Sequence, residues 1–260
     1  MSAPGLRRLV LALAQGLSDQ RAMGLAAEFA RDFDLDLLGV YAEDETLLRF
    51  AEFPFAREIR RLTHDWHELD PGRLSDELNV QAEAARRHLR QVLDRMGLRG
   101  GFEVRRGDPI HCVTEVCSAQ DAIVMTVSCG LGQAPMTALL PAAERSAAAV
   151  LVLPDRMVRH RGPIVAVAAR EDDPAVALAR ALAERQQARL LVLATGVDAE
   201  AAAEGEVRPL ASLAADDVLR ALATIRGERL VVLAPEAAAR IGTEGALRIA
   251  AAGAVPVLLA

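Results

Sequence analysis

The chain has 260 residues, which suffices for one large or two modest domains, and its 52% hydrophobic and 25% charged content is that of a globular protein. A formal net charge of −6 argues against wholesale binding to nucleic acid, and no apolar run reaches the ~20 residues that span a bilayer. The sequence contains no lysine, which excludes a P-loop lysine and a Schiff-base enzyme. The three cysteines have no C-x-x-C spacing, so they favour neither a disulfide framework nor structural zinc. We therefore expect a cytoplasmic protein that binds neither nucleic acid nor membrane.

In the first part of the chain, short apolar runs alternate with helical patterns. Residues 9–14 and 37–41 are apolar runs of strand length, and between them Ser18 and Asp19 offer a helix cap. Residues 121–127 and 149–153 form two further apolar runs. Apolar strands that alternate with helices predict a parallel sheet covered on both faces.

The second part of the chain repeats this order. Its predicted strands cover residues 164–168, 190–193, 229–234 and 255–259. The sequence therefore predicts an α/β protein of two tandem lobes, residues 1–155 and 162–260. Each lobe is expected to be a parallel doubly wound sheet flanked by helices. We also expect the last strands of the two lobes, 150–153 and 255–258, to lie side by side within one chain.

The two parts differ in one long excursion, residues 43–101. It contains an apolar helical stripe over 78–96 and, before it, half of the aromatic residues of the chain. These aromatic residues either cap the core of the first lobe or form a lid over a cleft or a surface for a protein partner. The candidate residues for the lid or partner surface are Phe50, Phe53, Phe55 and Trp66.

The second lobe has no counterpart of the long helix, although residues 206–208 (Glu-Val-Arg) repeat the sequence of residues 103–105. A parallel crossover needs about a dozen residues or more. We therefore expect the second lobe to have lost a strand pairing as well as this helix.

One segment of the first lobe points to a family. A strand ending in Gly107-Asp108-Pro109 precedes a helix over 110–118 and a strand that reads Asp-Ala-Ile-Val-Met over 121–125. This order, and the Glu-Arg pair at 144–145 before the last strand, resembles the universal stress protein family. The resemblance covers nearly the whole chain as two copies, good in the first and weak in the second. It implies a five-stranded parallel sheet in each lobe, with ligands at the switch point outside the carboxyl ends of the strands.

Many members of that family bind ATP through a loop that reads Gly-x2-Gly-x9-Gly-Ser/Thr after the fourth strand. This chain has the shorter spacing Gly130-Leu-Gly132, and Leu140-Pro141 stands where the Gly-Ser pair would fall. A proline has no N–H to offer a phosphate. The acidic residue that the family carries after its first strand aligns here with Gln15. An altered nucleotide site would be lined by Gln15, Val40, Gly107, Asp108, Ser128, Gly130 and Gly132.

These departures favour a non-enzymatic stress-response or regulatory protein that binds an unknown protein partner and retains a degenerate nucleotide site. The alternative is a sensor that binds ATP or another adenylate in the first lobe. We expect no resident cofactor and no metal, because His64 and His67 have no third ligand at a convincing spacing. The sequence also leaves a homodimer open.

Overall fold

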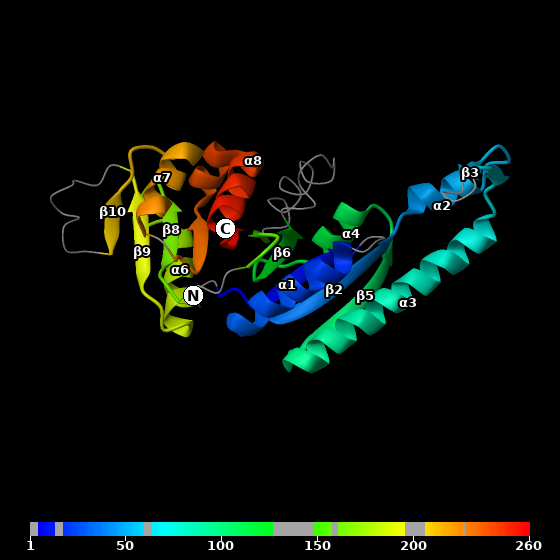
Figure 1. Ribbon diagram of the computed structural model, residues 1–260, viewed down its shortest axis with the longest axis horizontal. Coiled ribbons are helices and arrows are strands. Elements are labelled where there is room, and N and C mark those ends of the chain that lie inside the picture. The colour runs from blue at the N-terminus through cyan, green and yellow to red at the C-terminus, as the bar shows by residue number, and fades with distance from the viewer. Residues whose placement is uncertain are drawn as a thin grey trace.

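The computed structural model of the chain describes residues 5–13, 18–59, 64–126, 148–157, 161–195, 206–225 and 227–260 (Figure 1). Ten strands form one sheet in the order β10-β9-β8-β11-β12-β7-β6-β1-β2-β5. Those of the N-terminal half are β1 (Arg8–Leu13), β2 (Asp36–Glu43), β5 (Gly100–Arg106), β6 (Asp121–Thr126) and β7 (Ala149–Leu153). Those of the C-terminal half are β8 (Ile164–Ala168), β9 (Leu190–Ala194), β10 (Val207–Pro209), β11 (Leu230–Leu233) and β12 (Val257–Leu259).

Both halves of the sheet use the same strand order. Counted along the chain, the five strands of each half lie in the order 3-2-1-4-5, and all pairs within a half are parallel. The halves join where β7 runs antiparallel to β12, with Val152 opposite Val257 and Val150 opposite Leu259. The predicted parallel α/β architecture is confirmed, and the first and fourth strands of each half are neighbours, which makes a switch point.

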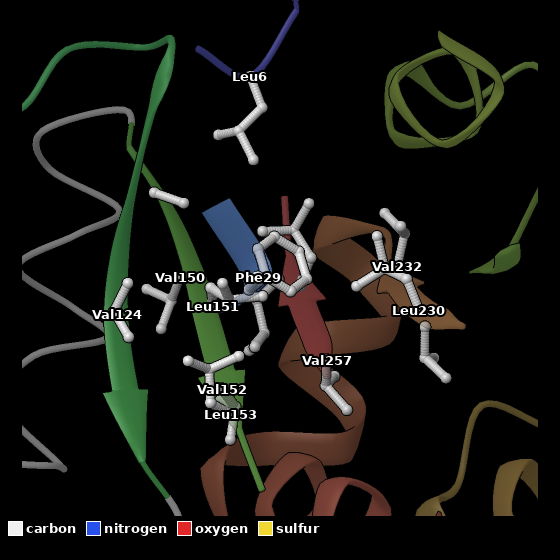
Figure 2. Packing of buried hydrophobic residues seen from close by; sticks show 14 of the residues in the cluster. Leu6, Phe29, Val124, Val150, Leu151, Val152, Leu153, Leu230, Val232 and Val257 are labelled. Atoms are coloured by element: carbon white, nitrogen blue, oxygen red, sulfur yellow. The ribbon is translucent and has the colours of Figure 1, made fainter. Parts of the chain in front are cut away.

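One hydrophobic core continues across this junction. The strands β6, β8, β9 and β11 are buried at every residue, as expected for strands with both faces covered. Figure 2 shows the side chains of β7, from Val150 to Leu153, beside Val257 of β12, with Phe29 of the first half nearby.

The expected loss of a strand pairing in the second half is wrong. Residues 207–209 form β10, whose Val207 and Pro209 pair with Val192 and Ala194 of β9 in parallel. The crossover between β9 and β10 is residues 195–206, about the minimum length for a parallel connection. The second half therefore has five strands like the first.

Helices flank the strands, and three of them begin at strong capping signals. They are α1 (Ser18–Asp32), α3 (Pro71–Met96), α4 (Pro109–Val116), α6 (Pro174–Arg185), α7 (Ala215–Ile225) and α8 (Pro235–Gly253). The side chains of Asp70, Asp108 and Asp173 accept backbone N–H groups at the starts of α3, α4 and α6, where proline follows as the first helical residue. No helix among the described residues is both long enough and apolar enough to cross a membrane.

The long helix α3 packs closely on the sheet through its C-terminal half. It contacts α1, β2 and β5, and Leu89, Val92 and Leu93 belong to the main core. This approach depends on Gly39 of β2, because a Cβ there would lie 2.6 Å from Leu89 Cδ2 and 2.9 Å from Leu13 Cδ1.

The N-terminal half of α3 continues beyond the sheet and carries a small substructure, which we call the arm (residues 44–70). The arm contains α2 (Glu45–Ala51) and a two-stranded hairpin of β3 (Arg57–Ile59) and β4 (Trp66–Glu68). It projects at the end of the molecule farthest from the second half (Figure 1). Ala51 and Ala56 are buried in the arm and Leu78 on α3, but none of the three belongs to the main core.

Candidate functional site

The described residues of the predicted nucleotide site belong to β2 and to the turn that follows β5. Val40 is fully buried within β2, paired with Ala12 and Glu103, so its side chain does not line an open site. Further along, the nearly buried Glu43 accepts hydrogen bonds from Arg106 Nε (3.3 Å) and Nη2 (3.2 Å). This pair of charged side chains therefore joins the carboxyl ends of β2 and β5.

Gly107 makes the turn from β5 into α4. Its φ of +144° is one that side-chain-bearing residues rarely adopt, and its N–H donates to Glu43 O at 3.0 Å. Asp108 follows as the cap of α4, and its Oδ1 accepts from His111 N at 2.9 Å. The carboxylate of Asp108 thus occupies the helix terminus that could otherwise attract a phosphate, and Pro109 offers no N–H there. The described residues of this edge therefore form no phosphate cradle.

Four residues of the predicted nucleotide site lie outside the described part of the chain: Gln15, Ser128, Gly130 and Gly132. The structure thus places Val40, Gly107 and Asp108 near the carboxyl edge and gives no geometry for the other four.

The equivalent edge of the second half is built differently. A single residue, Ala234, separates β11 from α8, and its N–H donates to Val167 O of β8 at 2.9 Å. Ala260 N donates to Leu233 O on the other side. Backbone hydrogen bonds therefore close this switch point, with no loop between β11 and α8 that could hold a phosphate.

Asp121 is the first residue of β6 and therefore lies at the amino ends of the strands, opposite the predicted nucleotide site. Arg8 donates to both of its oxygens, Nε to Oδ1 at 3.0 Å and Nη2 to Oδ2 at 2.8 Å, and also to Val116 O. Ser118 adds hydrogen bonds from its N and Oγ. Burial alone would raise the pKa of Asp121, but these hydrogen bonds outweigh burial and hold that pKa below its usual range. Asp121 is therefore a structural residue that ties β1, α4 and β6 together.

The described cysteines are poor nucleophiles. Burial raises the pKa of Cys112, and burial followed by the charge of Asp121 raises that of Cys117 to about 12. Such thiols carry almost no thiolate at neutral pH. No group of three potential metal ligands occurs among the described residues, where His64 is exposed and His67 pairs across the hairpin with Glu58.

The arm carries the main exposed apolar surface of the described chain. Phe55 is 69% exposed and Trp66 63% exposed, and Phe53 stacks on Phe55 with ring centroids 5.3 Å apart. Phe50 and Ile59 are also exposed. We call these five side chains the aromatic surface. Large apolar groups gathered at one place are typical of interaction sites, because their exposure to water is unfavourable.

The backbone beneath this surface is well supported. Asp44 Oδ1 accepts from Thr46 N at 2.8 Å at the start of α2, and Glu58 of β3 forms an ion pair with Arg73 of α3. The two ends of the hairpin are also tied together by the hydrogen bond from Leu69 N to Ala56 O. The aromatic side chains are thus displayed on an ordered support.

The position of the arm tests the three roles that the sequence leaves open for its aromatic residues, namely a cap of the core, a lid and a partner surface. The aromatic side chains do not cap the core of the first half, because they are exposed and lie outside that core. The arm packs on α3 and extends away from β1 and β6, so its position does not favour a lid over their carboxyl ends (Figure 1).

Sequence reasoning did not single out the Glu43–Arg106 or Arg8–Asp121 pairs as structural contacts. Charged residues at the two ends of otherwise apolar strands were the available signal. Without the register of β2 with β5 and of β1 with β6, however, their partners could not be assigned.

Comparison of the sequence with protein-family profiles and with curated proteins finds no match. Solved structures do match the fold. A universal stress protein from Archaeoglobus fulgidus matches with a TM-score of 0.61 at 11% identity, over 99% of this chain and 98% of that one. A protein of unknown function from Pseudomonas aeruginosa matches with a TM-score of 0.50 at 14% identity, over 99% of this chain and 93% of that one. The chain therefore has the universal stress protein fold along its length.

Proposed function

We propose that the chain is a universal stress protein that works as a cytoplasmic stress-response or regulatory protein without enzymatic activity, by binding a protein partner. The observation that carries this proposal is the aromatic surface. Aromatic residues are favoured at protein interfaces, and ones held on a hydrogen-bonded support lose little conformational freedom on binding. The fold supports the family assignment, and the described residues supply neither a reactive thiol nor a metal cluster.

Site-specific photo-crosslinking tests this proposal. A benzophenone amino acid replaces Phe55, and in a matched control it replaces Arg170, an exposed residue of the second half. The cells are irradiated under growth and under stress. A discrete adduct from position 55 that is absent from position 170 supports the proposal, because the control carries the same apolar group elsewhere. Equal adducts from both positions, or none from either, would refute it.

Trp66 offers a second readout because it is the only tryptophan of the chain. Its 63% exposure predicts red-shifted emission that acrylamide quenches readily. Addition of the crosslinked partner, once purified, should shift this emission to the blue and protect it from quenching. The Phe55→Ser variant should weaken that response without changing the melting temperature.

Binding of ATP or another adenylate in the first half is a second candidate. The switch point between β1 and β6 favours it, because open parallel sheets bind ligands at such points. Against it stand the capped start of α4 and the fully buried Val40. Calorimetric titration of ATP, with and without Mg²⁺, into protein free of co-purified nucleotide decides the matter. Saturable micromolar binding would establish the sensor, whereas no heat up to millimolar ATP would leave a degenerate site.

The same titration, followed by Trp66 fluorescence, tests whether the arm is a lid. A lid that closes over bound nucleotide would change the environment of the indole. If ATP binds and the emission stays constant, the arm acts independently of the nucleotide cleft.

A further inference from the structure

A second candidate site lies in the C-terminal half, at the amino ends of the strands. It is a pocket of about 390 Å³ between the last turns of α7 and α8 and the loop that enters β11. This volume falls within the range of small-molecule sites. The walls are apolar: Leu219, Leu222 and Ala223 from α7, and Ile249 and Ala252 from α8.

One charged side chain, Glu228, lines this pocket. It is only 5% exposed, yet its carboxylate has no hydrogen bond or ion pair to another described residue. In the described chain, every buried side-chain oxygen that is sealed from solvent has a hydrogen-bond partner. Because the Glu228 carboxylate has no partner among the described residues, it is not sealed, and it reaches solvent through the pocket that it lines. Gly253 makes room for it, since a Cβ at that position would lie 3.1 Å from Glu228 Oε1.

Three described arginines, on α7, on α8 and in the loop before β11, bind other groups. Arg220 pairs with Asp217 at 2.6 Å and Arg248 pairs with Asp216 at 2.7 Å. Arg229 donates to Oε1 of Gln186, the residue after α6, at 2.9 Å. Within the described part of the chain, the carboxylate therefore faces the pocket without a positive charge to balance it.

The helix ends add to the negative potential of the pocket. Both α7 and α8 end beside it, and the C-terminal end of a helix carries partial negative charge. A carboxylate that is largely removed from water is costly unless a cation pairs with it. Two helix ends and one carboxylate thus favour a positively charged group, while the leucine and isoleucine walls favour an apolar body.

We propose that this pocket binds a small aliphatic amine in its ammonium form. The ammonium group pairs with Glu228, and the hydrocarbon part packs between Leu222 of α7 and Ile249 of α8. An anion is repelled by the same carboxylate, and a neutral molecule of the same shape lacks the charge-assisted hydrogen bond that would offset the desolvation of Glu228.

Calorimetric titration of hexylamine tests the proposal, with hexan-1-ol as a neutral probe of the same length. We expect saturable hexylamine binding and at least tenfold weaker binding of the alcohol, since a charge-assisted hydrogen bond contributes about 1.5 kcal/mol or more and 1.4 kcal/mol is a factor of ten. The Glu228→Gln variant should lose about tenfold in hexylamine affinity. Glu236→Gln, which removes an exposed carboxylate at the other end of α8, should bind like the parent protein.

An independent variant keeps the test decisive if Glu228→Gln fails to fold. Ala252 is an exposed residue on the wall of the pocket, so Ala252→Leu should narrow the pocket without disturbing the core and should weaken hexylamine binding. The proposal is overturned if the parent protein does not bind hexylamine. It is also overturned if the alcohol binds equally well, or if Glu228→Gln and Ala252→Leu both keep the parent affinity.

Discussion

The two halves of the sheet share a strand order but differ in what is built on it. In the first half, residues 44–99 connect β2 to β5 and carry the arm and α3, whereas residues 195–206 make the same connection in the second half. The connections from the fourth to the fifth strand are similar in length, residues 127–148 in the first half and 234–256 in the second. The strands are constrained by packing on both faces, and the connections are not, so elaboration accumulates in the connections.

The amino ends of the central strands show a second difference. In the first half Arg8 pairs with the buried carboxylate of Asp121 at 2.8 Å. In the second half Arg229, which directly precedes β11, donates to the neutral side chain of Gln186 at 2.9 Å. The first of these contacts joins two charged side chains, whereas the second joins a charged side chain to a neutral amide.

Breaking these two contacts should have unequal effects. Arg8→Met leaves Asp121 buried without its counter-charge and should lower the free energy of unfolding by about 3 kcal/mol. Gln186→Ala removes a single hydrogen bond from an uncharged side chain and should cost about 1 kcal/mol. Urea denaturation of each variant, followed by circular dichroism, measures both values. Equal losses would show that the two halves are closed with the same strength.

The close packing of α3 distinguishes the first half and can be tested with two glycines. In Gly39→Ala the new Cβ would lie 2.6 Å from Leu89 Cδ2, so we expect a loss of about 2 kcal/mol. Gly24→Ala is the matched control, since nothing lies within 4 Å of a Cβ at that position of α1, and it should stabilise the chain by about 0.5–1 kcal/mol. If Gly39→Ala proved neutral in thermal unfolding, the packing of α3 against β2 would be looser than the structure shows.

The charged pair should also give the first half a dependence on acid. The pKa of Asp121 is lowered in the folded state relative to about 3.9 in the unfolded chain, so its contribution to stability is present above pH 4 and is lost as pH falls through the folded value. We expect Asp121→Asn to be less stable than the parent at pH 6 and to lose less stability between pH 5 and pH 3. Parallel pH profiles of the two proteins would contradict this assignment.

The smallest expected effect concerns the thiols. With a pKa of about 12, Cys117 should react with iodoacetamide at pH 7.5 far more slowly than a free thiol, and Cys112 should also be slow because it is buried. Mass spectrometry of peptides from the native protein measures both rates, with urea-unfolded protein as the reference. Fast alkylation of Cys117 in the native protein would mean that the turn between α4 and β6 opens readily.

The strands that could be predicted from sequence are those buried on both faces. Residues 149–153 and 164–168 were predicted with the bounds that the structure has, since a short uninterrupted apolar run bounded by polar or turn-forming residues is typical of a buried strand. The edge strand β10 was missed because it has only three residues, and Val207 is the single apolar one that is not a proline. Such a short segment has no hydrophobic pattern from which a strand could be predicted. Its pairing with β9 is a tertiary contact that no local pattern reveals.

For the candidate sites, the sequence indicated which residues are unusual but not where they lie in the fold. The aromatic residues of the arm stood out in a sequence with few others, but only the structure shows that α3 carries them beyond the sheet. Glu228 gave no signal at all. A glutamate between a helix and a strand is an ordinary surface residue in sequence, and its burial results from α7, α8 and Gly253 meeting around it.

The antiparallel junction of β7 with β12 has a consequence for self-association. It uses the last strand of each half, so the sheet ends instead at β5 and β10. Both of these edges discourage the addition of another strand: β5 carries Glu103, Arg105 and Arg106, and β10 is three residues long and contains Pro209. Edge-to-edge polymerisation of the sheet is thus disfavoured at both ends, and copies of this chain that associate should do so through side-chain surfaces instead.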